Sequence, residues 1–140
     1  MPIQFFFSAS NISLSNRNLL KHFIASIFKS EGKQLEHLNY VFCSDEYLLD
    51  INRTSLNHDY FTDIITFDLS SLKGRIEGEI YISVDRVRDN AQSLSLTIQE
   101  ELHRVIFHGA LHLCGYKDKS PKDIKAMRRA EDRYLAKYFK

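Results

Sequence analysis

The segment from Thr97 to Gly115 constrains the fold most, because the sequence marks both ends of one long apolar helix. Thr97 is a good helix cap, and Glu100 three positions later completes a capping box. Gly115 follows the last apolar residue, where helices commonly end in a left-handed turn. Leu, Val and Ile residues between these two ends recur mostly at three- and four-residue spacing. We therefore expect a buried helix that packs against other elements of the fold.

This predicted helix carries His108 and His112, which lie one turn apart on one helix face. Two imidazoles so placed can hold one metal ion, and Asp118, after the glycine stop, can fold back as a third ligand. Two histidines and a carboxylate, with a fourth position left to water, are typical of a catalytic zinc site. The pair alone is weak evidence in a chain with six histidines. Asp123 or a second water molecule is an alternative to Asp118 as the completing ligand.

A zinc protease is the familiar alternative for a histidine pair on a helix. In those enzymes the residue after the first histidine is a glutamate that activates the water. Here that residue is Gly109, which offers neither an acid nor a base. Gly109 instead lets the helix lie close against another part of the backbone, although glycine costs about 1 kcal/mol of helix propensity relative to alanine. A metalloprotease is therefore the least favoured of the functions considered.

Length and composition predict one globular domain that spans residues 1–140. Hydrophobic residues make up 44% of the chain and charged residues 26%, which is ordinary for a soluble protein. Cys43 and Cys114 lie in apolar stretches and are expected to be two buried thiols rather than a disulfide framework. The sequence starts without a signal-peptide pattern and has no segment suited to a membrane helix. We expect a cytoplasmic protein that does not contact a membrane.

The net charge of +1 hides an uneven distribution along the chain. Residues 1–116 contain ten Lys and Arg against fourteen Asp and Glu, whereas residues 117–140 contain nine against four. The basic segment, residues 117–140, begins beside the proposed ligand Asp118 and could attract a polyanion such as RNA. The alternative is an ordinary solvated helix face.

Hydrophobic periodicity predicts an α+β fold in the order βαβαββααα, with a four-stranded mixed sheet and about five helices. The expected strands cover residues 2–8, 37–43, 63–69 and 77–84. The expected helices cover residues 15–30, 45 to about 54, 85–94, the segment between Thr97 and Gly115, and 120–138. The first helix could open at Ser10, Asn11, Ser13 or Ser15. The last helix should pack through Ile124, Met127, Tyr134 and Leu135. Two crossovers favour parallel strand pairs, and the short turn at residues 70–74 requires an antiparallel hairpin.

The run from His108 to Tyr116, with Gly109, Leu111, His112, Leu113 and Gly115, resembles the signature of the YbeY family. Asn52, Asp59, residues 62–67 and residues 78–83 also resemble that family's pattern, in the same order. The similarity therefore covers most of residues 37–118, and the expected elements agree with the family's α+β fold.

The resemblance implies a zinc-dependent endoribonuclease, specific for single-stranded RNA, that acts in 16S rRNA 3′-end maturation and ribosome quality control. The implied partners are ribosomal RNA and the small ribosomal subunit or its assembly factors. His108 and His112 become metal ligands, and Asp118 occupies the position of the family's third histidine. An aspartate also binds zinc, but two histidines and a carboxylate suit iron or manganese as well.

A second departure from the family lies in the loop after Asn52, where an arginine of the family aligns with Leu56. Arg53 or His58 could supply the missing charge, or both are ordinary exposed loop residues. Single-stranded RNA could stack on Tyr60 or Tyr116, although aromatic residues in such positions more often pack than stack. The alternative function from a different class is a ribosome-associated RNA-binding module in which a structural metal only fixes the helix end.

Overall fold

The computed structural model describes residues 1–8 and 12–140. In chain order the elements are β1 (Ile3–Phe7), α1 (Arg17–Ser30), β2 (Gln34–Cys43), α2 (Asp45–Ser55), β3 (Ile64–Asp68), β4 (Arg75–Ser83), α3 (Val84–Ser93), α4 (Ile98–Leu113) and α5 (Pro121–Tyr138). The predicted order of strands and helices is confirmed, and the four strands form one mixed sheet.

The sheet has the strand order β1-β2-β4-β3. Strand β2 pairs in parallel with β1 on one side and with β4 on the other, as the two crossovers predict. Strand β3 pairs antiparallel with β4, which confirms the predicted hairpin. The two central strands therefore hold the middle of the sheet, and the two short strands lie at its edges.

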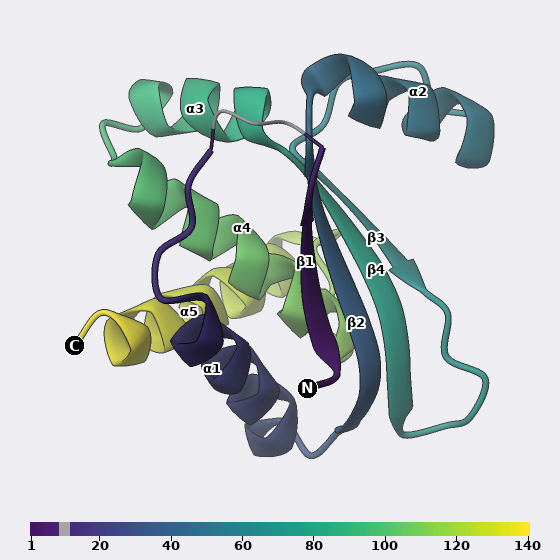
Figure 1. The fold of residues 1–140 in the computed structure, drawn as a ribbon, viewed down its shortest axis with the longest axis vertical. Coiled ribbons are helices and arrows are strands. Elements are labelled where there is room, and N and C mark those ends of the chain that lie inside the picture. The colour runs from purple at the N-terminus through teal and green to yellow at the C-terminus, as the bar shows by residue number, and fades with distance from the viewer. Residues whose placement is uncertain (9–11) are drawn as a thin grey trace.

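The two faces of the sheet are covered unequally. Leu38, Tyr40 and Phe42 alternate along β2 and are fully buried in the main core with Ile80 and Ile82 of β4. Helices α1 and α4 cover this face, and α5 packs on α4, whereas α2 lies against the other face (Figure 1). The cluster under α2 is small, with Cys43, Leu48 and Ile65 as its buried members.

Helix α4 lies on the sheet and packs against α1, α3 and α5, and its residues are mostly buried. The predicted capping box at Thr97 and Glu100 is present. A Cβ atom on Gly109 would lie 2.8 Å from Cδ1 of Ile80 and 3.1 Å from Cδ1 of Ile64. The helix does approach the sheet closely at Gly109, but the nearest atoms belong to side chains and not to the predicted backbone. The Tyr40 hydroxyl donates a buried hydrogen bond of 2.8 Å to the carbonyl oxygen of Ile106.

Several predicted boundaries differ from the structure. Helix α1 has Asn16 as its N-cap, with φ of 53° and no side-chain cap, so Ser13 and Ser15 do not open it. Ser10 and Asn11 lie outside the described residues. Strand β2 begins three residues earlier than predicted, because its polar start at Gln34 pairs with the start of β4. The side chains at this end of β2 are mostly polar, so the sequence shows no apolar alternation there, although the backbone pairs with β4.

The last helix differs from its predicted packing at one position. Met127 and Tyr134 are buried as predicted, and Leu135 is half-buried against the core. Ile124, however, is 49% exposed, so its assignment to the packing side is wrong. It lies in the first turn of α5 and lines a cleft beside α4.

Both cysteines are free and buried, as predicted. Burial is the main cause that raises the pKa of the Cys43 and Cys114 thiols to about 12. Neither thiol is therefore a ready nucleophile at neutral pH. None of the helices in the described part of the chain has the length and apolar character needed to cross a membrane.

We predict that Tyr40→Phe lowers the free energy of unfolding by about 1 kcal/mol, because it removes the hydrogen bond between the sheet and α4 and leaves the ring in place. Tyr47→Phe is the matched control, since Tyr47 is 49% exposed on α2 and should change stability by less than about 0.5 kcal/mol. Urea denaturation of both variants measures the difference. Equal effects would show that the buried bond does not anchor α4.

Candidate active site

A cleft of about 480 Å³ opens beside α4 and contains His108. Residues of α4 line the cleft together with residues of α3 and α5, the two helices that pack against α4. Thr62 and Asp63, just before β3, and Ile64, the first residue of β3, also line the cleft. Asp118 enters the cleft from the loop between α4 and α5.

His108 is held by carboxylates at both ring nitrogens. Its Nδ1 lies 2.7 Å from Oε2 of Glu131, and its Nε2 lies 3.5 Å from Oδ2 of Asp118. A carboxylate can only accept, so Nδ1 carries the proton and donates it to Glu131. This leaves Nε2 as the nitrogen that faces Asp118. The side chain of His108 is 22% exposed, so the ring is reachable from the cleft.

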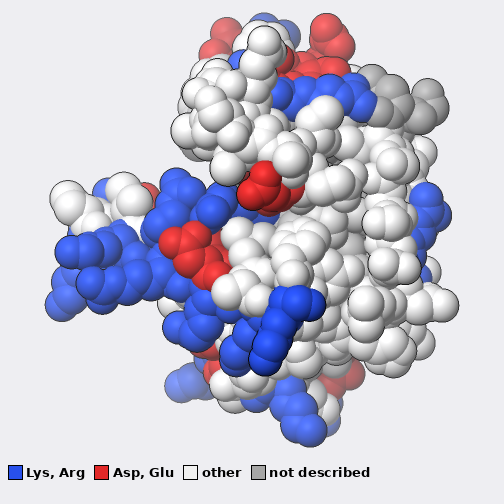
Figure 2. Space-filling view, turned by 90° about the vertical axis from the view of Figure 1, so that its left-hand side faces the viewer, with Lys and Arg blue, Asp and Glu red and all other residues white. Residues whose placement is uncertain are grey.

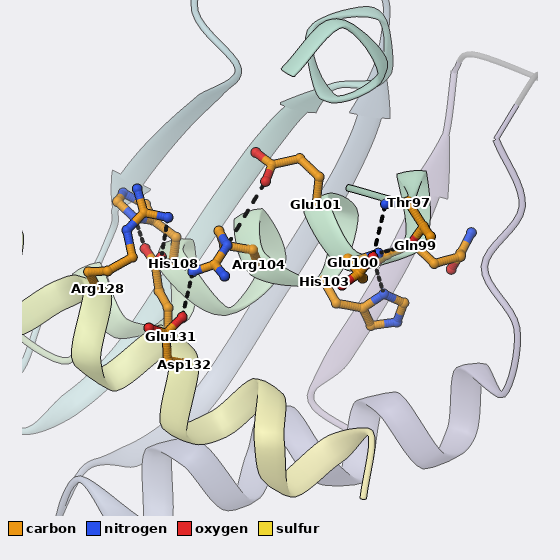
Figure 3. A network of polar contacts seen from close by, with 10 residues as sticks. All are labelled: Thr97, Gln99, Glu100, Glu101, His103, Arg104, His108, Arg128, Glu131 and Asp132. Carbon is orange, nitrogen blue, oxygen red and sulfur yellow. Dashed lines mark hydrogen bonds and ion pairs between the residues drawn. The ribbon is translucent and has the colours of Figure 1, made fainter. Parts of the chain in front are cut away.

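Glu131 is the centre of a polar network that joins α5 to α4 (Figure 3). Nη1 of Arg104 donates to Oε1 of Glu131 and to Oδ1 of Asp132, each at 3.0 Å. The Glu131 side chain is only 5% exposed, whereas that of Asp132 is 59% exposed. Glu131 thus fixes two cleft residues of α4, the imidazole of His108 and the guanidinium of Arg104.

Charges in the cleft perturb several ionisation equilibria. Burial disfavours the charged form of His108, but the hydrogen bond to Glu131 and the charges of Glu131, Asp118 and Asp63 outweigh it and raise the pKa of His108. Burial is also the main cause that raises the pKa of the carboxyls of Asp63 and Glu101. The cleft therefore combines a histidine that favours its charged form with carboxyls that resist ionisation.

The structure brings only some of the predicted site residues together. His108 and Asp118 both line the cleft, whereas His112 is exposed at the end of α4 and is not among the lining residues. Arg53 pairs with Asp59 at 2.5 Å on the surface and does not line the cleft either. Leu56 is the exposed C-cap of α2. No His, Cys, Asp and Glu side chains in residues 1–8 and 12–140 form a group of three or more arranged to hold a metal ion.

The donor atoms near His108 nevertheless fit a divalent transition metal in kind. An imidazole nitrogen and a carboxylate oxygen face each other at 3.5 Å, with a second imidazole one helical turn along. The hydrogen bond from Nδ1 to a buried carboxylate is the usual support of a metal-binding histidine, because it fixes the ring and its tautomer. The residues therefore fit a metal ion in the type of their donor atoms and in the hydrogen bond that orients His108. The described residues do not, however, bring three ligands together around one point.

The sequence analysis missed four ionisable residues of the cleft, namely Asp63, Glu101, Arg104 and Glu131. A signal for Glu131 was available, because it shares the buried stripe of α5 with Met127, Ala130 and Tyr134 at three- and four-residue spacing. A glutamate on an apolar stripe needs a cationic or hydrogen-bonding partner. Arg104 and Glu101 likewise share a face of α4 with His108.

Comparison of this sequence with known proteins identifies the family that it resembles. The family model described as Endoribonuclease YbeY matches residues 5–139. An endoribonuclease YbeY of Cytophaga hutchinsonii is 52% identical over 134 residues, which cover 96% of this chain and 94% of that protein. An endoribonuclease YbeY of Porphyromonas gingivalis is 48% identical over 131 residues, or 92% of this chain and 86% of that protein.

A solved structure agrees with the fold. The solution structure of TM1509 from Thermotoga maritima has a TM-score of 0.64 and 27% sequence identity, and the match covers 98% of this chain and 89% of that one. The names of the relatives define the class as RNA-cleaving nucleases, which are hydrolases. The chain belongs to the endoribonuclease YbeY family.

We predict that Glu131→Gln lowers the free energy of unfolding by about 2 kcal/mol, because a buried carboxylate that serves both His108 and Arg104 loses its charge. Asp132→Asn is the matched control, since Asp132 accepts from the same guanidinium at a mostly exposed position and should cost less than about 1 kcal/mol. Chemical denaturation measures both. A larger loss for Asp132→Asn than for Glu131→Gln would overturn the central place given to Glu131.

Proposed function

We propose that the protein is a metal-dependent endoribonuclease, specific for single-stranded RNA, that acts in 16S rRNA 3′-end maturation and ribosome quality control. The observation that carries the proposal is His108 in the cleft, oriented by Glu131 and facing Asp118, in a chain of an endoribonuclease family. Ribosomal RNA and the small ribosomal subunit or its assembly factors are the proposed partners.

His108, His112 and Asp118 are the proposed ligands of one divalent ion. Such an ion supplies acidification of a water molecule and polarisation of a phosphate oxygen, the chemistry that phosphodiester hydrolysis needs. Glu131 holds the proton on Nδ1 of His108 and so keeps Nε2 available as a donor atom. The ligand set favours zinc and also suits iron or manganese, and the anionic Asp118 lowers the net positive charge of the site.

The surface around the cleft supports binding of a polyanion. Figure 2 shows Lys and Arg side chains gathered on the left and lower parts of one face, with acidic side chains among them. Arg128 of α5 lines the cleft, is 57% exposed and lies 3.8 Å from Glu131, so its guanidinium is loosely paired. Lys125 and Arg129 are exposed on the same helix. Arg128 can contact an RNA backbone that enters the cleft, and Lys125 and Arg129 add positive charge to the same helix.

An exposed aromatic pair lies in the loop that leads to β3. Asn52 holds this loop, because its side-chain Nδ2 donates to the carbonyl oxygen of Tyr60 at 2.9 Å. His58 and Tyr60 stack with ring centroids 5.2 Å apart, and Tyr60 is 55% exposed. Tyr116 is half-buried and packs against the core. Of the two predicted stacking residues, Tyr60 is thus the better candidate for a base of single-stranded RNA.

A ribosome-associated RNA-binding module with a structural metal is the second candidate function. The exposure of His112 outside the cleft favours it, as does the apolar Leu56 where the resemblance implies an arginine. An assay of single-stranded RNA cleavage with chelator, and then with the metal restored, separates the two candidates. Reversible loss of cleavage in a folded protein supports the enzyme. Chelation that melts the fold of a protein that never cleaved RNA supports the structural role.

We predict that His112→Ala abolishes both metal uptake and RNA cleavage, because it removes one of three ligands. His22→Ala is the matched control, since His22 is an exposed histidine on α1 and should change neither. Elemental analysis of the purified proteins gives the metal content, and a labelled single-stranded RNA gives the cleavage rate. Full metal content in His112→Ala would remove His112 from the ligand set.

The basic segment, residues 117–140, leads to a prediction about how RNA binding depends on salt concentration. Replacing both Lys125 and Arg129 by alanine should weaken RNA binding, because fewer phosphates of the bound strand are then neutralised. The slope of log K against log salt concentration should fall by up to about 1.4, since each neutralised phosphate of a single strand contributes about 0.7. The matched control replaces Lys29 and Lys73, two exposed lysines outside α5. An equal change of slope in both double variants would mean that α5 is no preferred RNA surface.

A further inference from the structure

The cleft has an apolar part that the proposed metal ligands do not use. Leu94, the C-cap of α3, is 57% exposed, and Ile124, in the first turn of α5, is 49% exposed, yet both line the cleft. Exposed aliphatic surface of this kind favours a covering partner by about 25 cal/mol per Å². The two side chains come from α3 and α5, two helices that both pack on α4, so two different elements supply this apolar lining.

A buried carboxylate lies in the same cleft. Glu101 of α4 is only 4% exposed and is one of the lining residues. Its Oε1 has no hydrogen-bond partner among the described residues, and the nearest cation, Nε of Arg104, is 4.0 Å away (Figure 3). A buried acceptor without a donor is costly, so it marks a place where a ligand N–H or O–H would be stabilised.

The spacing along α4 relates these features to the candidate active site. Glu101 and His108 are seven residues apart, which places them on one helix face about 10 Å apart along the axis. On α5, Ile124 and Arg128 are four residues apart and so are neighbours on one face. The apolar Ile124 therefore lies beside the cation Arg128, and the acceptor Glu101 lies on the same face of α4 as His108, about 10 Å from it.

We propose that this part of the cleft is a subsite for one nucleobase of a single-stranded RNA, with Leu94 and Ile124 against the faces of the base and Glu101 as the acceptor for an N–H on its edge. The inference rests on the proposed function and names how that site holds its substrate. Bases have apolar faces, polar edges with N–H donors and a covalently attached phosphate, which matches the three features in the cleft. A purely apolar ligand would leave Glu101 unpaired and would not need Arg128.

The test compares two heptamers of identical phosphorothioate-linked ribose backbone, one of mixed base sequence and one with every base removed. Both resist cleavage, so fluorescence anisotropy reports binding alone. Leu94→Ser should reduce the preference for the base-containing heptamer about fivefold, since it removes about 1 kcal/mol of apolar contact. Its affinity for the abasic heptamer should stay unchanged. Leu69→Ser, at a leucine 54% exposed after β3, is the matched control and should leave the preference as in the unmodified protein.

A second variant tests the acceptor. Glu101→Leu, which removes both carboxylate oxygens, should also lower the preference for the base-containing heptamer, even if the loss of a negative charge strengthens binding of both heptamers. Glu46→Leu, at an exposed glutamate of α2, is its control. Thermal denaturation of Glu101→Leu verifies that the variant is folded. If it is not folded, Leu94→Ser alone decides the test.

The outcomes separate the subsite from the proposed function. A lower preference in Leu94→Ser, with the abasic affinity unchanged, supports the subsite. Equal weakening of both heptamers, or no effect on either, overturns the subsite and leaves the nuclease proposal standing. If the unmodified protein binds neither heptamer, the proposed RNA site fails together with its base subsite.

Discussion

The carboxylate of Glu131 is the contact on which the candidate site depends. It lies on the buried stripe of α5 and accepts hydrogen bonds from His108 and Arg104, so it also holds α5 against α4. Removing a carboxylate from water is costly, and this cost is offset only if its oxygens find donors. Here both oxygens do. The same contact that joins the two helices therefore sets the orientation of the imidazole in the cleft.

Helix α4 can occupy this place because of features that are local in the sequence. Gly109 permits the helix to approach Ile80 and Ile64, and Tyr40 donates from the sheet to the backbone of Ile106. The apolar side of α4 faces the sheet, so its polar side, with Glu101, Arg104 and His108, faces the cleft. The fold thus directs one polar stripe of a mostly buried helix into the cleft.

The sequence predicted the elements well because their signals are local. The capping box at Thr97 and the glycine at position 115 mark the two ends of α4. The alternation of apolar residues in β2 and β4 marks the face of each strand that is buried. Contacts between distant segments were not predictable in the same way. The partnership of Glu131 with His108 depends on how α5 packs, and periodicity does not distinguish a core position from a cleft wall, which explains the error at Ile124.

The placement of His112 has a geometric reason. Four residues advance a helix by about 400°, so His112 is rotated about 40° from His108 and extends one turn beyond it. That offset leaves His108 partly buried in the cleft and His112 exposed at the end of α4. The spacing therefore predicted a shared face, but how far Asp118 folds back towards both rings depends on the loop after Gly115. Sequence spacing alone does not define that loop.

Anomalous scattering from crystals of the untreated protein tests the central claim most directly, because it gives both the element and its position. We expect one peak from a transition metal, with Nε2 of His108, His112 and Asp118 at ligand distances of about 2.0 to 2.2 Å. A peak bound elsewhere in the molecule, or fully loaded protein without density between these three side chains, would contradict the proposed metal centre.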